Sequence, residues 1–331
     1  MLWLVALIGT LEVREVIRSL RRPAAALPIA FGALAVLGML WSVASIQEQL
    51  LTLKTVSRLM LIPLLLLQFS RSEKGAMALY AFLVSCTVLM AVSWIIASLQ
   101  PRNTPNFGVP VKDSIIQSGE FLLCAFALIY LCLKAWQTSE RLRAFALAAW
   151  ALAFLANIAL VATSRTSMVV FFVLVVLLAV RQLHWKGAIA TLLGGLIFAA
   201  VVAALSPYVR ERVQSVVQEV QDYRQRDAET SAGYRLEFWK RSIGIIAQAP
   251  IIGHGIGSIE EMFRRSVVGQ SNMAATVTNN PHNQTLFVAI QLGVVGVIIL
   301  YAMWIAHALM FWRPGAAAWV GLVVVVQNVV S

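Results

Sequence analysis

The chain has 331 residues, of which 60% are hydrophobic and only 12% charged, and its mean hydropathy is +0.80. Soluble domains carry about 25% charged residues, so this composition excludes a doubly wound nucleotide-binding domain, a disordered chain and a disulfide scaffold. It predicts an all-α polytopic integral membrane protein. The net charge of +11 is then typical of cytoplasmic anchoring residues, and no nucleic-acid partner is predicted from it.

Nine long apolar segments follow one another along the chain, and we expect a bundle of at least nine transmembrane helices. Most of them have 19 to 22 residues, close to the about 20 with which a helix crosses the hydrocarbon region. The three cysteines lie in these segments and are interpreted as small core residues. The segments are 24–44, 50–69, 76–97, 115–133, 144–162, 167–180, 187–205, 286–306 and 315–330.

Basic residues are concentrated in alternate loops, which predicts the orientation of the chain. If residues 1–23 are cytoplasmic, the short loops hold twelve lysines and arginines inside and three outside. Residues 206–281 then form a large, partly helical periplasmic module between two parts of the bundle, 1–205 and 282–331. This module is nearly neutral, and its sequence has helical character with a predicted break near Thr230 to Gly233. The inside residues are Arg14, Arg18, Arg21, Arg22, Arg71, Lys74, Lys134, Arg141, Arg143, Arg181, Lys186 and Arg313, and the outside ones are Arg102, Lys112 and Arg165.

Lys54 and Arg58 form a basic pair near the outer end of segment 50–69. They are four residues apart, so a helix places both on one face. Contact with lipid headgroups is the simpler interpretation, and a supporting role in anion binding is the alternative.

Arg165 lies in the short turn TSRTS between two apolar segments. Segment 167–180 would span only about 21 Å as a helix, so we expect the turn to lie below the outer membrane surface. Thr163 or Ser164 can cap the following helix, which would place a positive helix end beside the arginine. A charge at membrane depth is costly, which favours an anion ligand facing a cavity over an arginine that contacts headgroups.

The predicted periplasmic module contains two features that are ambiguous by themselves. Arg235 stands at the start of the amphipathic stretch GYRLEFWKR, where an ordinary surface arginine is the simplest interpretation. The run GHGIG at 253–257 is similar to a phosphate-binding loop. However, no strand precedes the run, so a tight turn after Pro250 is favoured.

His282 lies in the stretch NNPHNQT, just before an apolar segment. Asn280 is a typical N-cap and Pro281 suits the first helical position, so we predict that the helix begins with His282. The positive end of a helix disfavours imidazolium, which would hold His282 neutral near pH 7 and able to accept a proton. The same helix end could bind an anion, and a histidine that only caps the helix is the alternative.

These pieces, taken in order, resemble the O-antigen ligase and O-antigen polymerase superfamily of bacterial envelope enzymes. Ser164-Arg165 opens a membrane helix, and Arg235 and Trp239 precede the proline and glycine turn in a large outer loop. His282-Asn283 is followed after nine residues by Gly-Val-Val-Gly at 293–296, a pattern most similar to the ligases. The resemblance covers roughly residues 110–310. Because the family has more membrane helices than nine, we expect segments to be missing at one or both ends.

The resemblance implies a glycosyltransferase of the bacterial inner membrane with its active site on the periplasmic side. Such ligases move O-antigen polysaccharide from undecaprenyl diphosphate to lipid A-core in an inverting reaction, and neither a metal nor another cofactor is expected. The partners would be the lipid-linked donor, the lipid A-core acceptor and membrane lipids, without nucleic acid. The implied site consists of the general base His282, the diphosphate ligands Arg165 and Arg235, and the supporting residues Lys54, Arg58 and Asn283.

Two alternative functions remain open at this point. An O-antigen polymerase or a protein O-oligosaccharyltransferase shares the donor and differs in the acceptor, which the sequence does not reveal. A flippase or exporter of lipid-linked oligosaccharides would also need basic residues for the lipid headgroup. A transporter is expected to have polar or broken helices near the membrane midplane and repeated halves. The polar residues here cluster at one membrane face without an internal repeat, which favours an enzyme.

The predicted orientation can be tested by cysteine labelling in a variant that lacks the three native cysteines. A cysteine beside Asp227 should react with a membrane-impermeant thiol reagent once the outer membrane is permeabilised. A cysteine beside Arg141, on the opposite predicted side, should react only after the inner membrane is opened. The reverse pattern would overturn the orientation.

Overall fold

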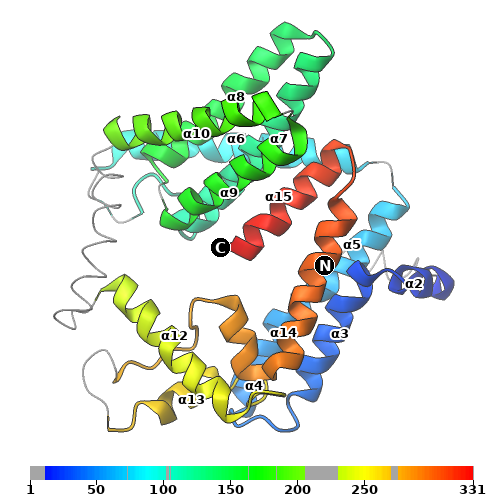
Figure 1. Cartoon of the computed structure of the whole chain (residues 1–331), viewed down its shortest axis with the longest axis vertical. Coiled ribbons are helices and arrows are strands. Elements are labelled where there is room, and N and C mark those ends of the chain that lie inside the picture. Colours follow the sequence, from blue (N-terminus) through cyan, green and yellow to red (C-terminus); the bar gives the residue numbers. More distant parts are fainter. Residues whose placement is uncertain are drawn as a thin grey trace. The chain divides into compact units, whose positions relative to one another are not determined.

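The computed structural model describes residues 12–72, 74–101, 104, 106–162, 164–183, 185–205, 230–269 and 275–330 (Figure 1). Every regular element among them is a helix, which confirms the predicted all-α class for this part of the chain. The chain forms two compact units, one from Met1–Glu73 with Ser215–Ala306 and the other from Lys74–Gln214 with His307–Ser331. The predicted division at residues 205/206 and 281/282 concerns the side of the membrane and stays a prediction.

The first unit combines the N-terminal part of the described sequence with the later stretch from α12 to α14. Its core includes Phe31, Val288 and Leu292, with a second cluster of Phe238, Phe263 and Ile290 where α12 and α13 pack on α14. Its helices are α2 (Val13–Leu20), α3 (Pro23–Leu37), α4 (Ile46–Val56), η1 (Ser57–Met60), α5 (Leu61–Ser70), α12 (Ser231–Gln248), α13 (Ile259–Ser266) and most of α14 (Gln284–Phe311).

The second unit is built around α7, which is the most buried of the described membrane-length helices. Phe121 packs against Phe154 of α8 with ring centroids 5.2 Å apart, and Trp319 of α15 donates its indole N–H to the Phe126 carbonyl at 2.8 Å. These aromatic contacts hold α8 and α15 against α7. The helices of this unit are α6 (Gly75–Leu99), α7 (Ser114–Gln137), α8 (Arg141–Leu160), α9 (Arg165–Gln182), α10 (Trp185–Leu205) and α15 (Ala316–Val330).

Six described helices are long and apolar enough to cross a membrane, or seven if α2 and α3, which meet at 90°, count as one broken span. The chain is therefore a multi-pass helical membrane protein, but nine spans are not confirmed. Segment 24–44 shows one reason, because its helix ends at Leu37 and the chain then turns. The six are Ile46–Ser70, Gly75–Leu99, Ser114–Gln137, Arg141–Leu160, Arg165–Gln182 and Gln284–Phe311, and shorter apolar helices are Trp185–Ile197 and Ala316–Val330.

The helix that follows the TSRTS turn is longer than its apolar segment. Ser164, one of the two caps that the sequence allowed, is the N-cap and accepts a hydrogen bond from the Ser167 amide at 3.0 Å. The helix runs over 18 residues from Arg165, or about 27 Å. The expectation of a helix of only about 21 Å was therefore wrong, because the polar residues at both ends of 167–180 also adopt helical structure.

The defining feature of the first unit is a break in α14 at Gly293, whose φ of 61° and ψ of −159° are not helical. In an unbroken helix, the amides of Val294 and Val295 would donate to the carbonyls of Ile290 and Gln291. Here they donate instead to the carbonyls of residues 250 and 251, at 2.8 and 3.3 Å. The freed carbonyls of Ile290 and Gln291 accept from the amides of residues 254 and 255, both at 2.9 Å. The turn 250–255 thus replaces both missing helical bonds.

Glycines make this close approach possible. Gly253, Gly255 and Gly257 all have positive φ, and a Cβ atom on any of them would collide with backbone atoms. At Gly253 that Cβ would come within 2.5 Å of the Gln291 carbonyl carbon, and at Gly257 within 2.8 Å of the Gln49 amide nitrogen. The turn is therefore enclosed by α14 on one side and by the chain around residues 42–49 on the other.

The same bonds decide between the two interpretations of the run GHGIG. The amide of Ile256 donates to the Gly38 carbonyl at 3.2 Å, and that of Gly257 donates to the Gln291 side chain at 2.6 Å. The amides of His254 and Gly255 are bonded to α14 as described. Because protein acceptors use these N–H groups, they cannot hold a phosphate, and the tight-turn interpretation is confirmed.

The stability of the first unit should depend on Gly293. An alanine there would have to adopt a φ of 61° and would collide with the Ile251 carbonyl. The backbone conformation alone costs about 1–3 kcal/mol, so Gly293→Ala should lower the unfolding midpoint in detergent. Gly244→Ala is the matched control, since that glycine lies in α12 with open space around its Cβ direction, and it should be neutral or stabilising. Equal midpoints for both variants would contradict this account.

Candidate functional site

Helix α12 carries the predicted site residue Arg235, and its packing places it firmly in the first unit. The helix starts after Thr230, whose side chain accepts from the Gly233 amide at 3.0 Å, so its first residues lie where the sequence predicted a helix break. Phe238 and Ile245 then bury the inner face of α12 in the cluster with α13 and α14. The part of the predicted module before Thr230 lies outside the described residues.

Two side chains of α12 connect it to the segment that leads into α14. Glu237 and Arg241 form an ion pair at 3.0 Å with side chains only 13% and 9% exposed, and the guanidinium also donates to the Thr276 carbonyl at 3.4 Å. Trp239 donates its indole N–H to the Pro281 carbonyl at 3.0 Å. Because Trp239 is one helical turn after Arg235, this bond brings the residue before His282 to the α12 face that bears Arg235.

The local structure around His282 differs from the predicted cap. Helix α14 begins at Gln284, and Asn283 accepts from the Leu286 amide at 3.0 Å, so Asn283 is at the capping position. Asn280 accepts from the His282 amide at 2.8 Å, and His282 has a φ of 54°. The prediction that Asn280 caps the helix was wrong. The reason is that the asparagine closes a turn with the residue two positions on, as Asn side chains also do.

The electrostatic surroundings keep His282 neutral. The imidazole is exposed at the surface of its unit. Partial desolvation lowers its pKa below the usual 6.5, and the positive charge of Arg235 lowers this pKa further. The sequence predicted a neutral histidine from the helix end. The lowered pKa agrees with this prediction of a neutral histidine. Its larger cause in the structure is partial desolvation, and its smaller cause is the charge of Arg235.

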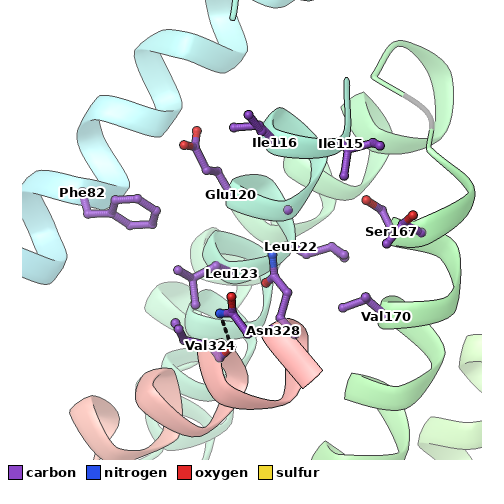
Figure 2. A pocket seen from close by; sticks show the side chains of 13 residues that line it. Phe82, Ile115, Ile116, Glu120, Leu122, Leu123, Ser167, Val170, Val324 and Asn328 are labelled. Carbon is purple, nitrogen blue, oxygen red and sulfur yellow. Dashed lines mark hydrogen bonds between the residues drawn. The ribbon is translucent and has the colours of Figure 1, made fainter. Parts of the chain in front are cut away.

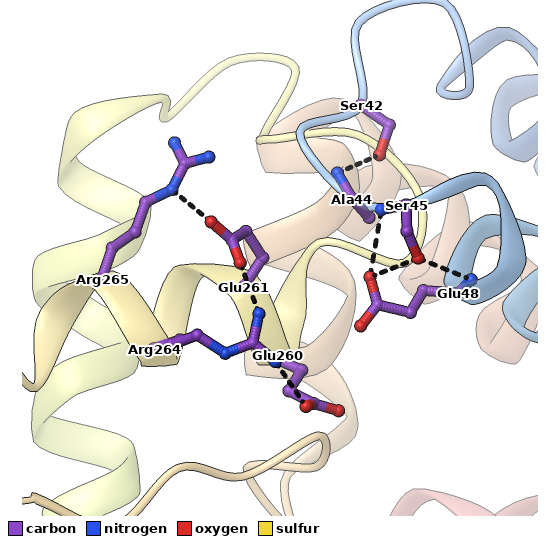
Figure 3. A network of polar contacts seen from close by, with 8 residues as sticks. All are labelled: Ser42, Ala44, Ser45, Glu48, Glu260, Glu261, Arg264 and Arg265. Carbon is purple, nitrogen blue, oxygen red and sulfur yellow. Dashed lines mark hydrogen bonds and ion pairs between the residues drawn. The ribbon is translucent and has the colours of Figure 1, made fainter.

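Arg235 differs from the other arginines in the described part of the module. Arg241 is in the buried pair with Glu237. The two arginines of α13 pair with glutamates of the same helix. Figure 3 shows these exposed pairs, with Arg264 on Glu260 and Glu261 at 2.8 and 2.6 Å, and Arg265 on Glu261 at 2.7 Å. Arg235 is exposed and makes no ion pair or hydrogen bond with any residue that the structure describes. Its guanidinium is therefore available for an anion.

The other predicted site residues divide between the two units. Lys54 in α4 and Arg58 in η1 belong to the first unit and are exposed, which suits either of their two interpretations. Arg165 belongs to the second unit, where it is half-buried at the first position of α9. Next to it, the hydroxyl of Ser167 lies 2.7 Å from that of Ser164 and 2.5 Å from that of Ser118.

Sequence reasoning missed one charged residue. Glu120 lies inside the apolar segment 115–133. In the structure this residue of α7 lines a pocket of the second unit. The signal was available, because an acidic residue within a membrane-length apolar run is costly. No group of three or more His, Cys, Asp or Glu side chains that could hold a metal ion occurs among the described residues.

Residues 150–301 match the family model described as O-antigen ligase. This part of the chain belongs to the O-antigen ligase superfamily. The matched region includes Arg165, Arg235, His282 and the break at Gly293. An uncharacterized protein of Haemophilus influenzae is 29% identical over 131 residues, which are 38% of this chain and 33% of that protein. The chain thus spans about a third of the length of this relative.

The charge of Arg235 should be measurable in the pKa of His282. Arg235→Gln removes a positive charge that disfavours imidazolium, so the pKa of His282 should rise toward 6.5. An NMR titration of the labelled histidines, assigned with a His282→Gln variant, would measure it. Lys240→Gln removes the same charge from an exposed position on the same helix, and it should leave this pKa unchanged. An unshifted His282 in Arg235→Gln would show that the two side chains do not interact.

Proposed function

We propose that this chain is an O-antigen ligase that transfers polysaccharide from undecaprenyl diphosphate to lipid A-core on the periplasmic side of the bacterial inner membrane. One observation in the matched domain carries the proposal. The contact from Trp239 to Pro281 holds an unpaired arginine, Arg235, and a neutral histidine, His282, on neighbouring segments. Transfer from a lipid diphosphate to a hydroxyl needs these two groups, a fixed cation and a base.

In the proposed reaction, neutral His282 accepts the proton of the acceptor hydroxyl. The hydroxyl oxygen forms a bond to C1 of the donor sugar while the bond from C1 to the diphosphate oxygen breaks. Attack from the face opposite the leaving group inverts the configuration at C1. The electron pair of the broken bond remains on undecaprenyl diphosphate, whose added negative charge Arg235 stabilises through its forked N–H groups.

Arg165 is proposed as the second diphosphate ligand. It is the first residue of α9, where the helix end carries partial positive charge, and Ser164 caps this end by accepting from the amide of Ser167. Lys54 and Arg58 are proposed to support anion binding from their exposed positions. Asn283 has a local role in this proposal, because its side chain caps α14 directly after His282.

The main rival functions differ in the acceptor or lack a reaction. An O-antigen polymerase or a protein O-oligosaccharyltransferase would use the same base and arginines with another acceptor. A flippase or exporter would move the lipid without forming a glycosidic bond. Purified chain should be incubated with lipid-linked polysaccharide and lipid A-core, repeat units or acceptor protein in separate reactions, without a gradient. Transfer to lipid A-core supports a ligase, transfer to another acceptor supports the first rival, and binding without product supports a transporter.

The general-base role of His282 predicts a specific loss. His282→Ala should still bind donor lipid, but transfer should fall about 10²–10⁴-fold. The wild-type rate should be flat near pH 7 and decline as pH drops through the pKa of His282, which lies below 6.5. This acidic limb should be absent in the variant. His282→Asn separates the base from a binding role, because asparagine keeps hydrogen bonds but accepts no proton near pH 7. An active asparagine variant would remove the general-base assignment.

His254→Ala is the control for loss of a histidine from the same unit. A ring nitrogen of His254 lies 2.9 Å from the Ile245 carbonyl, so its loss should cost about 1 kcal/mol of stability. It should leave the acidic limb of the rate profile in place. A limb that disappears in both variants would point to a general effect of unfolding.

A further inference from the structure

The second unit contains a pocket of about 360 Å³ lined by side chains of α6, α7, α9 and α15 (Figure 2). This volume is in the range of small-molecule sites. Most of the wall is apolar, with Phe82, Ile116 and Val324 among the lining residues. In Figure 2 the ring of Phe82 and the carboxylate of Glu120 come from neighbouring helices and extend into the same space.

Glu120 is the charged residue of this pocket. It is six residues into α7, a helix long and apolar enough to cross a membrane. A carboxylate in such a helix is costly and is retained where it has a function. Glu120 makes no hydrogen bond or ion pair with any residue that the structure describes, so its oxygen atoms are free to accept hydrogen bonds from a ligand.

A second acceptor of the pocket wall comes from Gln327 of α15. The side-chain oxygen of Gln327 is buried and has no hydrogen-bond partner among the described residues. Its amide nitrogen passes directly over Gly119, where an added Cβ would come within 2.6 Å of it. Gly119 therefore makes room for the Gln327 amide against α7. Buried acceptors without donors are rare in native proteins and mark a place where a ligand or water donates.

The pocket begins directly after Arg165. Thr166 and Ser167, the next two residues of α9, both line it. If Arg165 binds the donor diphosphate as proposed, the pocket can receive a group close to that diphosphate. The negative charge of Glu120 disfavours the phosphates themselves. The free acceptors require a ligand rich in hydrogen-bond donors, and the aromatic ring and aliphatic walls suit one with an apolar face.

We propose that this pocket binds one sugar ring of the substrate, with Glu120 and Gln327 accepting hydrogen bonds from its hydroxyls and Phe82 contacting its C–H face. The proposal rests on the proposed glycosyl transfer. The ring comes either from the sugar attached to the donor diphosphate or from the acceptor glycan, and both present the same hydroxyl chemistry.

The test compares binding of undecaprenyl diphosphate, undecaprenyl diphosphate carrying one hexose, and lipid A-core to the purified chain by native mass spectrometry. If the ring belongs to the donor, Glu120→Ala should weaken binding of the hexose-bearing lipid about tenfold. Binding of the bare lipid should stay unchanged. If the ring belongs to the acceptor, the same loss should appear with lipid A-core alone. Either result supports the site and identifies the source of the ring.

Further variants protect the test from effects on folding. Ile116→Trp adds bulk to the pocket wall one helical turn before Glu120 while it keeps the carboxylate, and it should cause the same selective loss. Glu140→Ala is the matched control, because Glu140 is an exposed acidic residue of the same unit outside the pocket. Unfolding midpoints would verify that all variants are folded.

Two results would overturn the site. One is unchanged binding of all three ligands in Glu120→Ala, and the other is an equal loss for the bare lipid, which would assign Glu120 to folding or to the diphosphate. In either case wild-type transfer would leave the proposed function standing. Wild-type chain that neither binds the lipid-linked donor nor forms product would overturn the proposed function and, with it, the sugar site.

Discussion

Four backbone hydrogen bonds between the 250–255 turn and the break in α14 organise the first unit. In the hydrocarbon region no water can pair with an exposed amide or carbonyl, so a broken helix is tolerated only when other groups satisfy it. The turn supplies these groups, and glycines allow the two backbones to meet. Each partner completes the other, because the turn amides would equally lack acceptors without the broken helix. The glycines at 253 and 293, 40 positions apart, thus permit the same close contact between the turn and the broken helix.

The positions of the candidate base His282 and the candidate cation Arg235 depend on this contact between the turn and α14. The turn follows directly after α12, and α14 begins directly after the segment with His282, so fixing the turn on α14 also fixes α12 beside the start of α14. Two further contacts fix α12 against the segment that leads into α14. One is made by the buried pair of Glu237 and Arg241, and the other by the indole of Trp239. A site for proton transfer needs such support, since an error of about 1 Å between reacting groups is costly.

Charge is used differently in the two units. Among the described residues of the first unit, Arg235 has no acidic partner, while the arginines of α13 are neutralised by glutamates of their own helix. In the described part of the second unit, the carboxylate of Glu120 and the amide oxygen of Gln327 both lack a hydrogen-bond partner and line one pocket. Unsatisfied groups of this kind lower stability unless a ligand compensates them. Their signs suit two parts of a single class of substrate, a diphosphate and a hydroxyl-bearing sugar ring.

Local chemistry in the sequence was enough for the membrane class, for a helix cap at Thr163 or Ser164 and for the tight turn after Pro250, because each depends on residues close together in the chain. The nine apolar runs exceed the six or seven spans that the described helices support. One reason is that a hydrophobic run does not show where the backbone turns, as it does after Leu37. The cap before α14 was misassigned because Asn280 and Asn283 suit both a cap and a turn. The motif order suggested Arg235 and His282, but only the tertiary structure joined them, through contacts between segments about 40 residues apart in the chain. It alone revealed the pocket at Glu120, because that pocket is formed by helices whose sequences carry no record of which neighbour they face.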